Sequence, residues 1–362
     1  MYSFILWNVS PEIFSVMGFP LVWYGLLFAS AFIVGMQLMT WMYKKEGKNP
    51  RDIESLIIYI LIGTVVGARL GHCLFYEPEY FLSHPLQILN LRGGGLASHG
   101  GALGIFIALL LYWRKHKNQG YLYLLDRMVL GVALGGCLIR VGNLMNSEII
   151  GKPTNAPTAF MFVNGIDKSI TDNPNFGLLV HNVGLRKVDT VLTEQGLTVQ
   201  PIEVTLHMSS LGNGNIDDLL NGGIKEALMN SSDYYEGKFV VPEHIKFSES
   251  TNEAGKKTII FTLYGVARHP SQLYEAVSCF VLFFLLLFIY LSYNGNVPEG
   301  RTFGWFIVIL FSLRFIYEYL KENQVDFEND LNFNMGQLLS IPILLVGLII
   351  LIRSYKPKGA IS

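Results

Sequence analysis

Seven apolar segments, each about long enough to cross a bilayer as a helix, constrain the fold of this chain more than any other feature. A helix needs about 20 predominantly apolar residues to span the hydrocarbon core. Hydrophobic residues make up 51% of the chain and charged residues only 15%, which is typical of a polytopic membrane protein. The expected spans are Phe19–Tyr43, Glu54–Phe75, Leu96–Trp113, Gly120–Leu144, Ser271–Tyr293, Thr302–Tyr319 and Gly336–Ile352.

The distribution of basic residues predicts the orientation of these spans. Lysine and arginine gather after the first, third, fifth and seventh segments, which all end on one side if every segment crosses. The first 18 residues contain neither, and the short loops on that side contain only Arg92 and Lys321. Loops rich in lysine and arginine remain in the cytoplasm. We therefore expect a multi-pass protein with its amino terminus outside and its carboxyl terminus in the cytoplasm.

A long polar stretch between the fourth and fifth segments predicts a separate outside head. The expected fold is thus an all-α polytopic membrane protein with seven transmembrane helices and a small, mainly β extracytoplasmic head inserted between helices 4 and 5. Its divisions would be 1–145 (helices 1–4), 146–267 (the periplasmic head) and 268–362 (helices 5–7 with a cytoplasmic carboxyl terminus). Within the head, β-branched and aromatic residues predict strands, and a polar-apolar run predicts one short helix. These are Thr198–His207, Lys238–Val241 and Lys257–Leu263 for the strands, and Asp217–Met229 for the helix.

Polar residues that are unusual for spans converge at their outer ends, which favours a site over scattered packing. Arg140 lies near the end of the fourth span, and Arg268 lies at the start of the fifth. Guanidinium groups match phosphate oxygens with two parallel hydrogen bonds, so we assign both arginines to the phosphate of a phospholipid headgroup. Arg314, which has Glu318 one helical turn later, and Arg69 are assigned to structure. Two alternatives remain open, namely a guanidinium that snorkels to the interface and neutralisation by nearby carboxylates. The carboxylates concerned are Glu148, Glu275 and Glu318.

His99 is the candidate general base, because an imidazole titrates near neutral pH and the two glycines that follow it permit close approach of a substrate. A packing histidine is the alternative at this position. No histidine or cysteine cluster has metal-ligand spacing, and no basic stripe with interleaved aromatics occurs. We therefore expect no metal and no nucleic-acid partner.

Several motifs, taken in order, give the chain a specific resemblance. They begin with Trp23-Tyr24-Gly25, Gly67-Ala68-Arg69-Leu70-Gly71 and Ser98-His99-Gly100-Gly101. They continue with Arg140-Val141-Gly142-Asn143 through Asn146, Glu148 and Gly151, then Arg268-His269-Pro270-Ser271-Gln272-Leu273-Tyr274-Glu275 and Met335-Gly336-Gln337. On these residues the chain resembles the prolipoprotein diacylglyceryl transferase family along its whole length.

The resemblance implies transfer of an sn-1,2-diacylglyceryl group from phosphatidylglycerol to the lipobox cysteine of a preprolipoprotein, with release of glycerol phosphate. That reaction is the first step of lipoprotein maturation in the bacterial cytoplasmic (inner) membrane, and it needs no cofactor. The expected partners are phosphatidylglycerol, the preprolipoprotein signal peptide with its lipobox cysteine, and the lipid bilayer. The resemblance implies catalytic roles for His99, Arg140, Arg268 and Tyr24. It implies substrate binding by Arg140, Asn143, Asn146, Glu148, Gly151, Gly100, Tyr264 and Gln272.

Two other classes of function compete with this reading. A transporter for an anionic solute could use an inward cluster of arginines, but it would need ionisable groups along the full depth of the membrane. We expect the cytoplasmic half of the spans to be nearly uniformly apolar, which favours a one-sided site. A lipid-binding scaffold would not need His99 beside two glycines. The stretch from about Gly165 to Gly255 exceeds the family's usual head and has no assigned role.

Overall fold

The computed structural model describes residues 4–90, 95, 97–116, 119–194, 197–209, 215–251, 256–322 and 333–356. Arg92 and Leu96, which entered the expectations above, lie outside these ranges. The chain forms two compact units. The head unit comprises Met1–Leu26, Arg140–Glu275 and Ile316–Leu331; the helical unit comprises Leu27–Ile139, Ala276–Phe315 and Asn332–Ser362.

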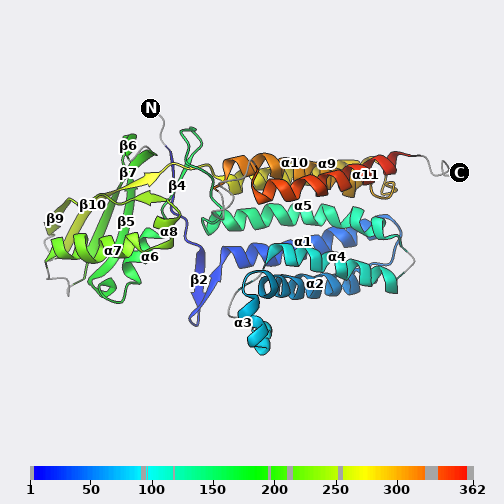
Figure 1. Cartoon of the computed structure of the whole chain (residues 1–362), viewed down its shortest axis with the longest axis horizontal. Helices are drawn as coiled ribbons and strands as arrows, with labels where there is room; N and C mark the ends of the chain where they lie inside the picture. Colours follow the sequence, from blue (N-terminus) through cyan, green and yellow to red (C-terminus); the bar gives the residue numbers. More distant parts are fainter. Residues whose placement is uncertain are drawn as a thin grey trace. The chain divides into compact units, whose positions relative to one another are not determined.

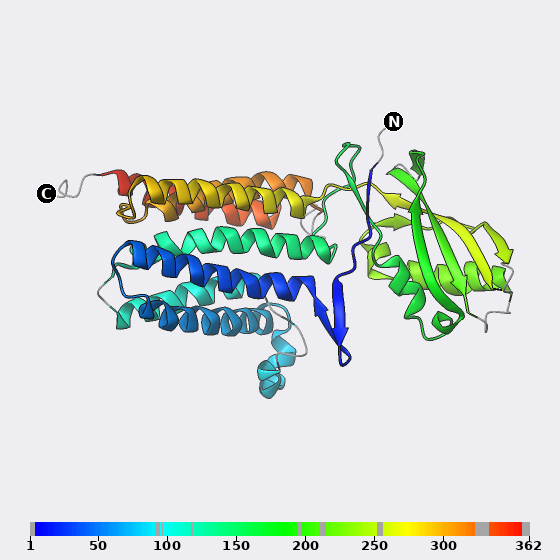
Figure 2. The same ribbon diagram turned by 180° about the vertical axis from the view of Figure 1, so that it is seen from behind.

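Six helices among the described residues are long and apolar enough to cross a membrane (Figures 1 and 2), as expected of a multi-pass membrane protein. Their most apolar windows carry at most two charged side chains. They are α1 (Trp23–Lys45), α2 (Arg51–Phe75), α5 (Tyr121–Met145), α9 (Ser271–Ser292), α10 (Arg301–Tyr317) with the short η5 (Glu318–Leu320), and α11 (Met335–Tyr355).

The third expected span corresponds to α4 (Ser98–Lys115), which is helical but has a shorter apolar run because it begins with Ser-His-Gly-Gly and ends with Arg-Lys. The start of the first expected span is wrong. Phe19–Val22 forms strand β3, because the chain turns at Met17 and Gly18, both with positive φ, and pairs back on strand β2 (Glu12–Val16). Helix α1 therefore begins only at Trp23.

Glycines bring α2 and α4 into backbone contact within the helical unit. A Cβ added to Gly100 would lie 2.3 Å from the carbonyl oxygen of Gly67, and one added to Gly71 would lie 2.7 Å from the Cα of Gly100. Small residues at such spacing let membrane helices pack by van der Waals contact and close backbone approach. This glycine seam fixes the start of α4, where His99 lies.

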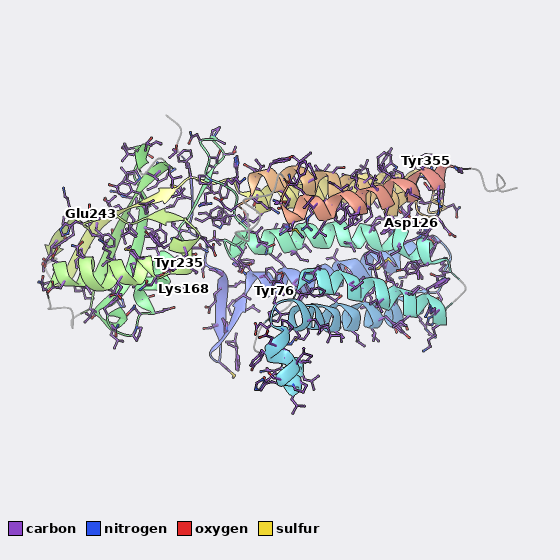
Figure 3. The ribbon with its side chains drawn as sticks, viewed as in Figure 1. Tyr76, Asp126, Lys168, Tyr235, Glu243 and Tyr355 are labelled. Atoms are coloured by element: carbon purple, nitrogen blue, oxygen red, sulfur yellow. The ribbon has the colours of Figure 1, made fainter. Side chains whose placement is uncertain are left out.

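Asp126 caps the opposite end of the helical bundle (labelled in Figure 3). Its carboxylate accepts hydrogen bonds from the backbone nitrogens of Gly300 and Phe303, at 2.6 and 2.8 Å, and from the Thr302 hydroxyl at 2.8 Å. Gly300 directly precedes α10, and Thr302 and Phe303 lie in its first turn, where a carboxylate also complements the helix dipole. Asp126 thus joins α5 to α10 as a structural residue.

The head unit contains a sheet in the order β5-β7-β10-β8, with β6 paired to β7 and β9 paired to β10 (Figure 2). Alternate residues of β7 are buried, including Ile202, Val204 and Leu206, and they pack against helices on one face of the sheet. The strands are β5 (Val180–Lys187), β6 (Leu192–Glu194), β7 (Leu197–Met208), β8 (Phe239–Val240), β9 (Phe247–Thr251) and β10 (Lys257–Val266). Strands β7, β8 and β10 overlap the three segments that the sequence predicts as strands.

Short helical segments cover that face of the sheet. The expected helix at Asp217–Met229 is instead a π-helical segment, η4 (Asp218–Ile224), that continues into α7 (Lys225–Met229). Its apolar residues Leu220, Ile224 and Leu228 are fully buried. The remaining pieces are α6 (Ile166–Thr171), η3 (Gly177–Leu179) and α8 (Ser232–Tyr235).

The amino-terminal residues pack with the head unit, although the sequence grouped them with helices 1–4. Strand β1 (Ile5–Trp7) pairs in parallel with β4 (Phe160–Phe162), and the indole nitrogen of Trp7 donates a hydrogen bond of 3.0 Å to the carbonyl of Leu144 at the end of α5. An arm follows α2 in the helical unit and consists of α3 (Pro78–Ser83) and the 3₁₀ helix η1 (Pro85–Leu89).

Candidate active site

A chain of polar side chains leaves the end of α5 in the head unit. Arg140 and Asn143 lie one turn apart on the same helix face, and Arg140 Nη1 donates to Asn143 Oδ1 at 3.2 Å. Asn143 Nδ2 in turn donates to Glu148 Oε2 at 3.3 Å, and Asn146 Nδ2 donates to Glu148 Oε1 at 3.1 Å. The structure therefore joins four of the predicted site residues in one network.

The turn between these residues is strained. Ser147 and Ile149 have φ of 54° and 57°, a conformation that is uncommon for any residue with a Cβ and costly for a β-branched one. The first turn of α9 holds it: Ser271 Oγ donates to the carbonyl of Ile149 at 2.6 Å, and Gln272 Nε2 donates to that of Glu148 at 2.5 Å. Two fully buried atoms beside this turn, Ser147 Oγ and Gln272 Oε1, have no hydrogen-bond partner among the described residues.

Glu275 links Arg140 to a second cation. Its Oε2 lies 2.6 Å from Arg140 Nε, and its Oε1 lies 2.5 Å from Lys321 Nζ. Lys321 also approaches Glu318 Oε1 at 3.5 Å. The sequence named Glu275 as a carboxylate that could neutralise the arginines, and its pair with Arg140 agrees with that alternative, but it did not name Lys321 as a site residue. The available signal was that Lys321 is a lone lysine on the side where basic residues are otherwise scarce.

Arg268 is held differently from Arg140. Its Nε donates to the carbonyl of Gly237 at 3.0 Å, and its Nη1 donates to the carbonyl of Gly151 at 3.0 Å and pairs with Glu322 Oε1 at 3.1 Å. Burial lowers the pKa of Arg268, but a guanidinium stays protonated in proteins, so the charge is retained and Glu322 neutralises it. Most of this guanidinium is used inside the protein.

Gly151 lies in a position that admits no side chain. A Cβ there would lie 2.6 Å from the Cβ of His269 and 2.7 Å from its carbonyl oxygen. The backbone nitrogen of Gly151 donates to that same carbonyl at 2.9 Å. Gly151 therefore locks the segment after α5 against the segment before α9, beside Arg268.

Tyr24 and Tyr264 occupy different places in the head unit. The ring of Tyr24 lies on Gly142, where an added Cβ would be 2.9 Å from Tyr24 Cδ2, and its hydroxyl is within electrostatic range of Glu148 and Arg140. Tyr264 lies in β10 opposite Pro201 and Val240. Tyr24 thus joins the network at the α5 end, whereas Tyr264 is a residue of the sheet.

His99 and Gly100 belong to the helical unit. The His99 ring is exposed and meets Phe75 edge-on at 5.3 Å and Tyr76 at 5.9 Å between ring centroids (Tyr76 is labelled in Figure 3). Gly100 forms part of the glycine seam. Arg69 is structural as expected, because all three of its nitrogens donate to carbonyls of the arm and its neighbour, namely Gln87, Ile88 and Gly95.

The helical unit contains a second group of polar side chains, an exception to the expectation that one half of each span is nearly uniformly apolar. Glu46, just after α1, accepts hydrogen bonds from Arg127 Nε at 3.1 Å, from Tyr290 at 3.0 Å and from Tyr123. Arg127 Nη2 also donates to the carbonyl of Gly295 at 2.8 Å. These groups neutralise one another at the α1–α5–α9 junction, so they form a second, structural polar cluster rather than an open row of charges.

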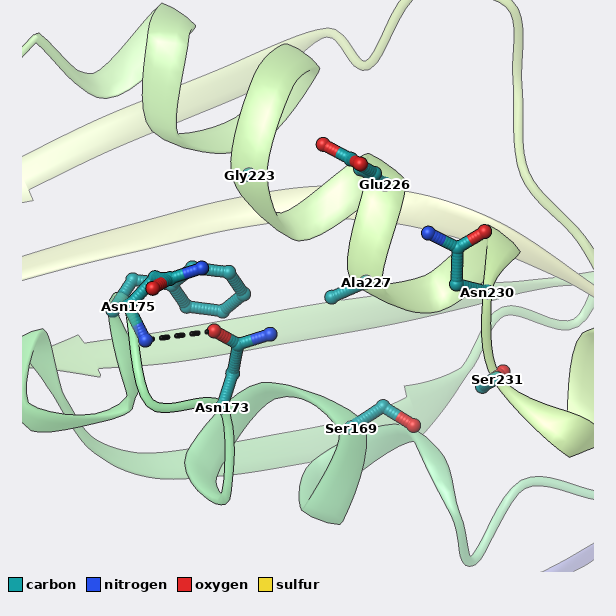
Figure 4. A pocket seen from close by; sticks show the side chains of 9 residues that line it. Ser169, Asn173, Asn175, Gly223, Glu226, Ala227, Asn230 and Ser231 are labelled. Atoms are coloured by element: carbon teal, nitrogen blue, oxygen red, sulfur yellow. Dashed lines mark hydrogen bonds between the residues drawn. The ribbon is translucent and has the colours of Figure 1, made fainter.

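A cavity in the head is lined by none of these residues (Figure 4). It measures about 400 Å³ and lies between the α6–η3 segment and the α7 helix. Amide and hydroxyl side chains, one carboxylate, Glu226, and the aromatic side chain of Phe176 line it. No group of three or more potential metal ligands occurs in the part of the chain that the structure describes.

Comparison with known proteins adds an independent observation. A family model described as prolipoprotein diacylglyceryl transferase matches residues 11–353. Three relatives, each named phosphatidylglycerol–prolipoprotein diacylglyceryl transferase, are 32% identical to this chain. The protein from Chloroherpeton thalassium matches over 98% of this chain and 96% of its own length; that from Tolumonas auensis, over 98% and 99%; and that from Bacteroides fragilis, over 98% and 97%.

Proposed function

The chain belongs to the prolipoprotein diacylglyceryl transferase family, and on that premise we propose that the network around Arg140 is its active site. The protein transfers a diacylglyceryl group from phosphatidylglycerol to a prolipoprotein, the first step of lipoprotein maturation. The observation that carries the site assignment is the half-buried guanidinium of Arg140. Its Nη2 has no hydrogen-bond partner among the described residues, while the rest of the group is held by Glu275 and Asn143.

In the proposed reaction, the lipobox cysteine attacks the glycerol carbon that carries the phosphate. A sulfur–carbon bond forms, the carbon–oxygen bond breaks, and the thiol proton passes to a base. The leaving glycerol phosphate gains negative charge, and a guanidinium that is already oriented stabilises that charge without reorganisation. We assign this role to Arg140, with phosphate contacts shared by the amides of Asn143 and Asn146.

The remaining predicted residues have supporting roles in this proposal. Arg268 keeps a positive charge nearby but acts mainly by locking Gly151 and Gly237, so we assign it to positioning. Gln272 holds the strained turn that presents Glu148, and Tyr24 borders the same region. His99 is the proposed base for the thiol, supported by its exposed ring at the start of α4. Tyr264 is proposed to support the site from the sheet.

We propose seven spans rather than six, with α4 as the additional one. The argument is that α4 packs along α2 through the glycine seam and ends in Arg114 and Lys115, which suit a cytoplasmic boundary. An odd number of spans leaves the amino terminus and the head outside and the carboxyl terminus in the cytoplasm. The membrane would be the bacterial cytoplasmic (inner) membrane, and the divisions 1–145, 146–267 and 268–362 describe placement across it.

The test uses purified protein in detergent with phosphatidylglycerol and a synthetic peptide that contains a lipobox cysteine. We expect the peptide to gain the mass of one diacylglyceryl group and glycerol phosphate to appear in equal amount. A peptide with serine in place of the cysteine is the control and should not react. Binding of the lipid without any transfer would favour a scaffold, and lipid-independent uptake of an anion into vesicles would favour a transporter.

A further inference from the structure

Arg140 can present two neighbouring nitrogens to a phosphate only if one of its protein partners moves. Glu275 occupies Nε at 2.6 Å, and Asn143 Oδ1 occupies Nη1 at 3.2 Å. Only Nη2 has no partner among the described residues. Because a guanidinium binds phosphate best through two parallel hydrogen bonds, either Glu275 or Asn143 must give way when the headgroup binds.

Charge decides between the two partners. Glu275 is paired with two cations, Arg140 and Lys321, so its carboxylate carries the negative charge next to Arg140. An arriving phosphate anion adds a negative charge next to the Glu275 carboxylate, and like charges repel strongly in a poorly hydrated site. Asn143 is neutral and can remain. The phosphate therefore competes with Glu275.

Lys321 gives Glu275 a second ion-pair partner when the carboxylate leaves Arg140. Its other oxygen lies 2.5 Å from Lys321 Nζ, and Lys321 is itself almost fully buried. A carboxylate that left Arg140 without a second cation would remain buried and unpaired, which is costly. Lys321 removes that cost because it can hold Glu275 while Arg140 turns to the phosphate.

We propose that Glu275 is an exchangeable counter-ion of Arg140, displaced by the lipid phosphate, and that Lys321 is the positioning residue that retains the displaced carboxylate. This inference rests on the proposed function of Arg140. It gives Arg140 an ion-pair partner in the substrate-free site, and it lets Glu275 return to Arg140 and help expel the anionic product, glycerol phosphate.

The test measures binding of glycerol phosphate to the purified protein, together with the KM for phosphatidylglycerol. Glu275→Gln should bind glycerol phosphate about tenfold more tightly and show a lower KM, because the competing charge is gone. Lys321→Met should bind about tenfold more weakly, and Lys321→Arg should restore binding. Glu203→Gln is the matched control, since it removes a carboxylate paired with the exposed Arg186 in the head and should change nothing.

The double variant separates an indirect role of Lys321 from direct contact with the phosphate. If Lys321 acts only through Glu275, Lys321→Met added to Glu275→Gln should have little further effect, so the two changes are not additive. A double variant as weak as Lys321→Met alone would overturn the positioning role. Should Glu275→Gln fail to fold, Glu275→Asp withdraws the carboxylate by one methylene and should tighten binding in the same direction.

Arg140→Ala separates failure of this inference from failure of the proposed function. Loss of glycerol phosphate binding in Arg140→Ala, with unchanged or weaker binding in Glu275→Gln, would reject the exchange but keep Arg140 as the phosphate site. Unchanged binding in Arg140→Ala itself would reject the phosphate site and the exchange together.

Discussion

Arg140 and Arg268 carry the same guanidinium group but are used in different ways. Arg268 donates to two backbone carbonyls and pairs with Glu322, whereas Arg140 keeps one nitrogen without a protein partner in the described residues. Sequence alone predicted that both belong to a polar site at the outer ends of the spans. It could not assign different roles to the two arginines, because the role of Arg268 depends on its hydrogen bond to Gly237, which lies 31 residues away in the chain.

Replacement of Arg140 by lysine tests whether the planar fork matters in addition to the charge. Arg140→Lys should lower kcat by about 100-fold or more, because a point charge cannot reproduce the paired hydrogen bonds and one transition-state donor is typically worth about 100- to 1,000-fold. The transfer assay with the lipobox peptide measures it. Arg186→Lys, in the exposed ion pair with Glu203, is the control. A fully active Arg140→Lys would show that the reaction does not need paired hydrogen bonds from a guanidinium.

His269 gives a prediction for the pH dependence of stability. Burial lowers the pKa of His269 below its ordinary value of 6.5, so the folded state binds this proton less readily than the unfolded state. The stability associated with neutral His269 is complete above about pH 6.5 and is lost as the pH falls through the lower folded-state pKa. The melting temperature should therefore fall between pH 7 and pH 5. His269→Gln should flatten that fall, and an identical slope in the variant would contradict the assignment.

At the level of elements, the glycine seam between α2 and α4 gives a matched pair of substitutions. Gly100→Ala puts a Cβ 2.3 Å from the carbonyl oxygen of Gly67, and backbone cannot yield as a flexible side chain would. We expect a loss of about 1–3 kcal/mol in stability, as for other overpacked interiors. Gly101→Ala meets only ordinary contacts, at 3.6 Å from Ala68 Cβ, and should be nearly neutral. Thermal unfolding measures the melting temperatures of the two variants. Equal melting temperatures would show that α2 and α4 are not in close backbone contact at Gly100.

The turn after α8 gives a second element-scale prediction, because it holds Arg268 from the head. Gly237 has φ of +65°, and a Cβ there would lie 2.6 Å from Arg268 Nη2. Gly237→Ala should cost about 1–2 kcal/mol from the left-handed backbone alone and also shift the guanidinium, so transfer activity should fall. Gly222→Ala, where nothing lies within 4 Å, is the control. Wild-type activity in Gly237→Ala would show that the head does not position Arg268.

The positions of the long helices could be predicted from sequence because apolar runs of span length have few alternatives in a polytopic protein. The shorter elements could not. Phe19–Val22 is as apolar as the start of a span, and composition alone does not separate such a segment from helix. The arm of α3 and η1 is too short for periodicity, and the role of Lys321 depends on contacts with Glu275 that no local pattern encodes.

At the scale of the whole molecule, the number of spans decides on which side of the membrane each terminus lies. The six helices that meet the criteria of length and apolarity would leave both termini on one side. Because α9, α10 and α11 separate the head from the carboxyl terminus, these two lie on opposite sides with either number of spans. Adding α4 puts the amino terminus and the head on the same side, in agreement with the pairing of β1 with β4 and with the basic residues that follow α1, α4 and α11. The proposed function places the head outside, so whether α4 crosses the membrane bears on the function as well as on the fold.

Single cysteines in a background without Cys73, Cys137 and Cys279 can determine whether α4 crosses the membrane. Leu86→Cys before α4 and Lys115→Cys at its end are both at exposed positions. If α4 spans, a membrane-impermeant maleimide added to intact cells should label Leu86→Cys at once and Lys115→Cys only after lysis, because the reagent reaches only the outer face. Asn230→Cys in the head and Lys44→Cys after α1 serve as the outside and inside references. Equal labelling of Leu86→Cys and Lys115→Cys in intact cells would place both ends of α4 on one face and require six spans, with both termini on one side of the membrane and the head on the other.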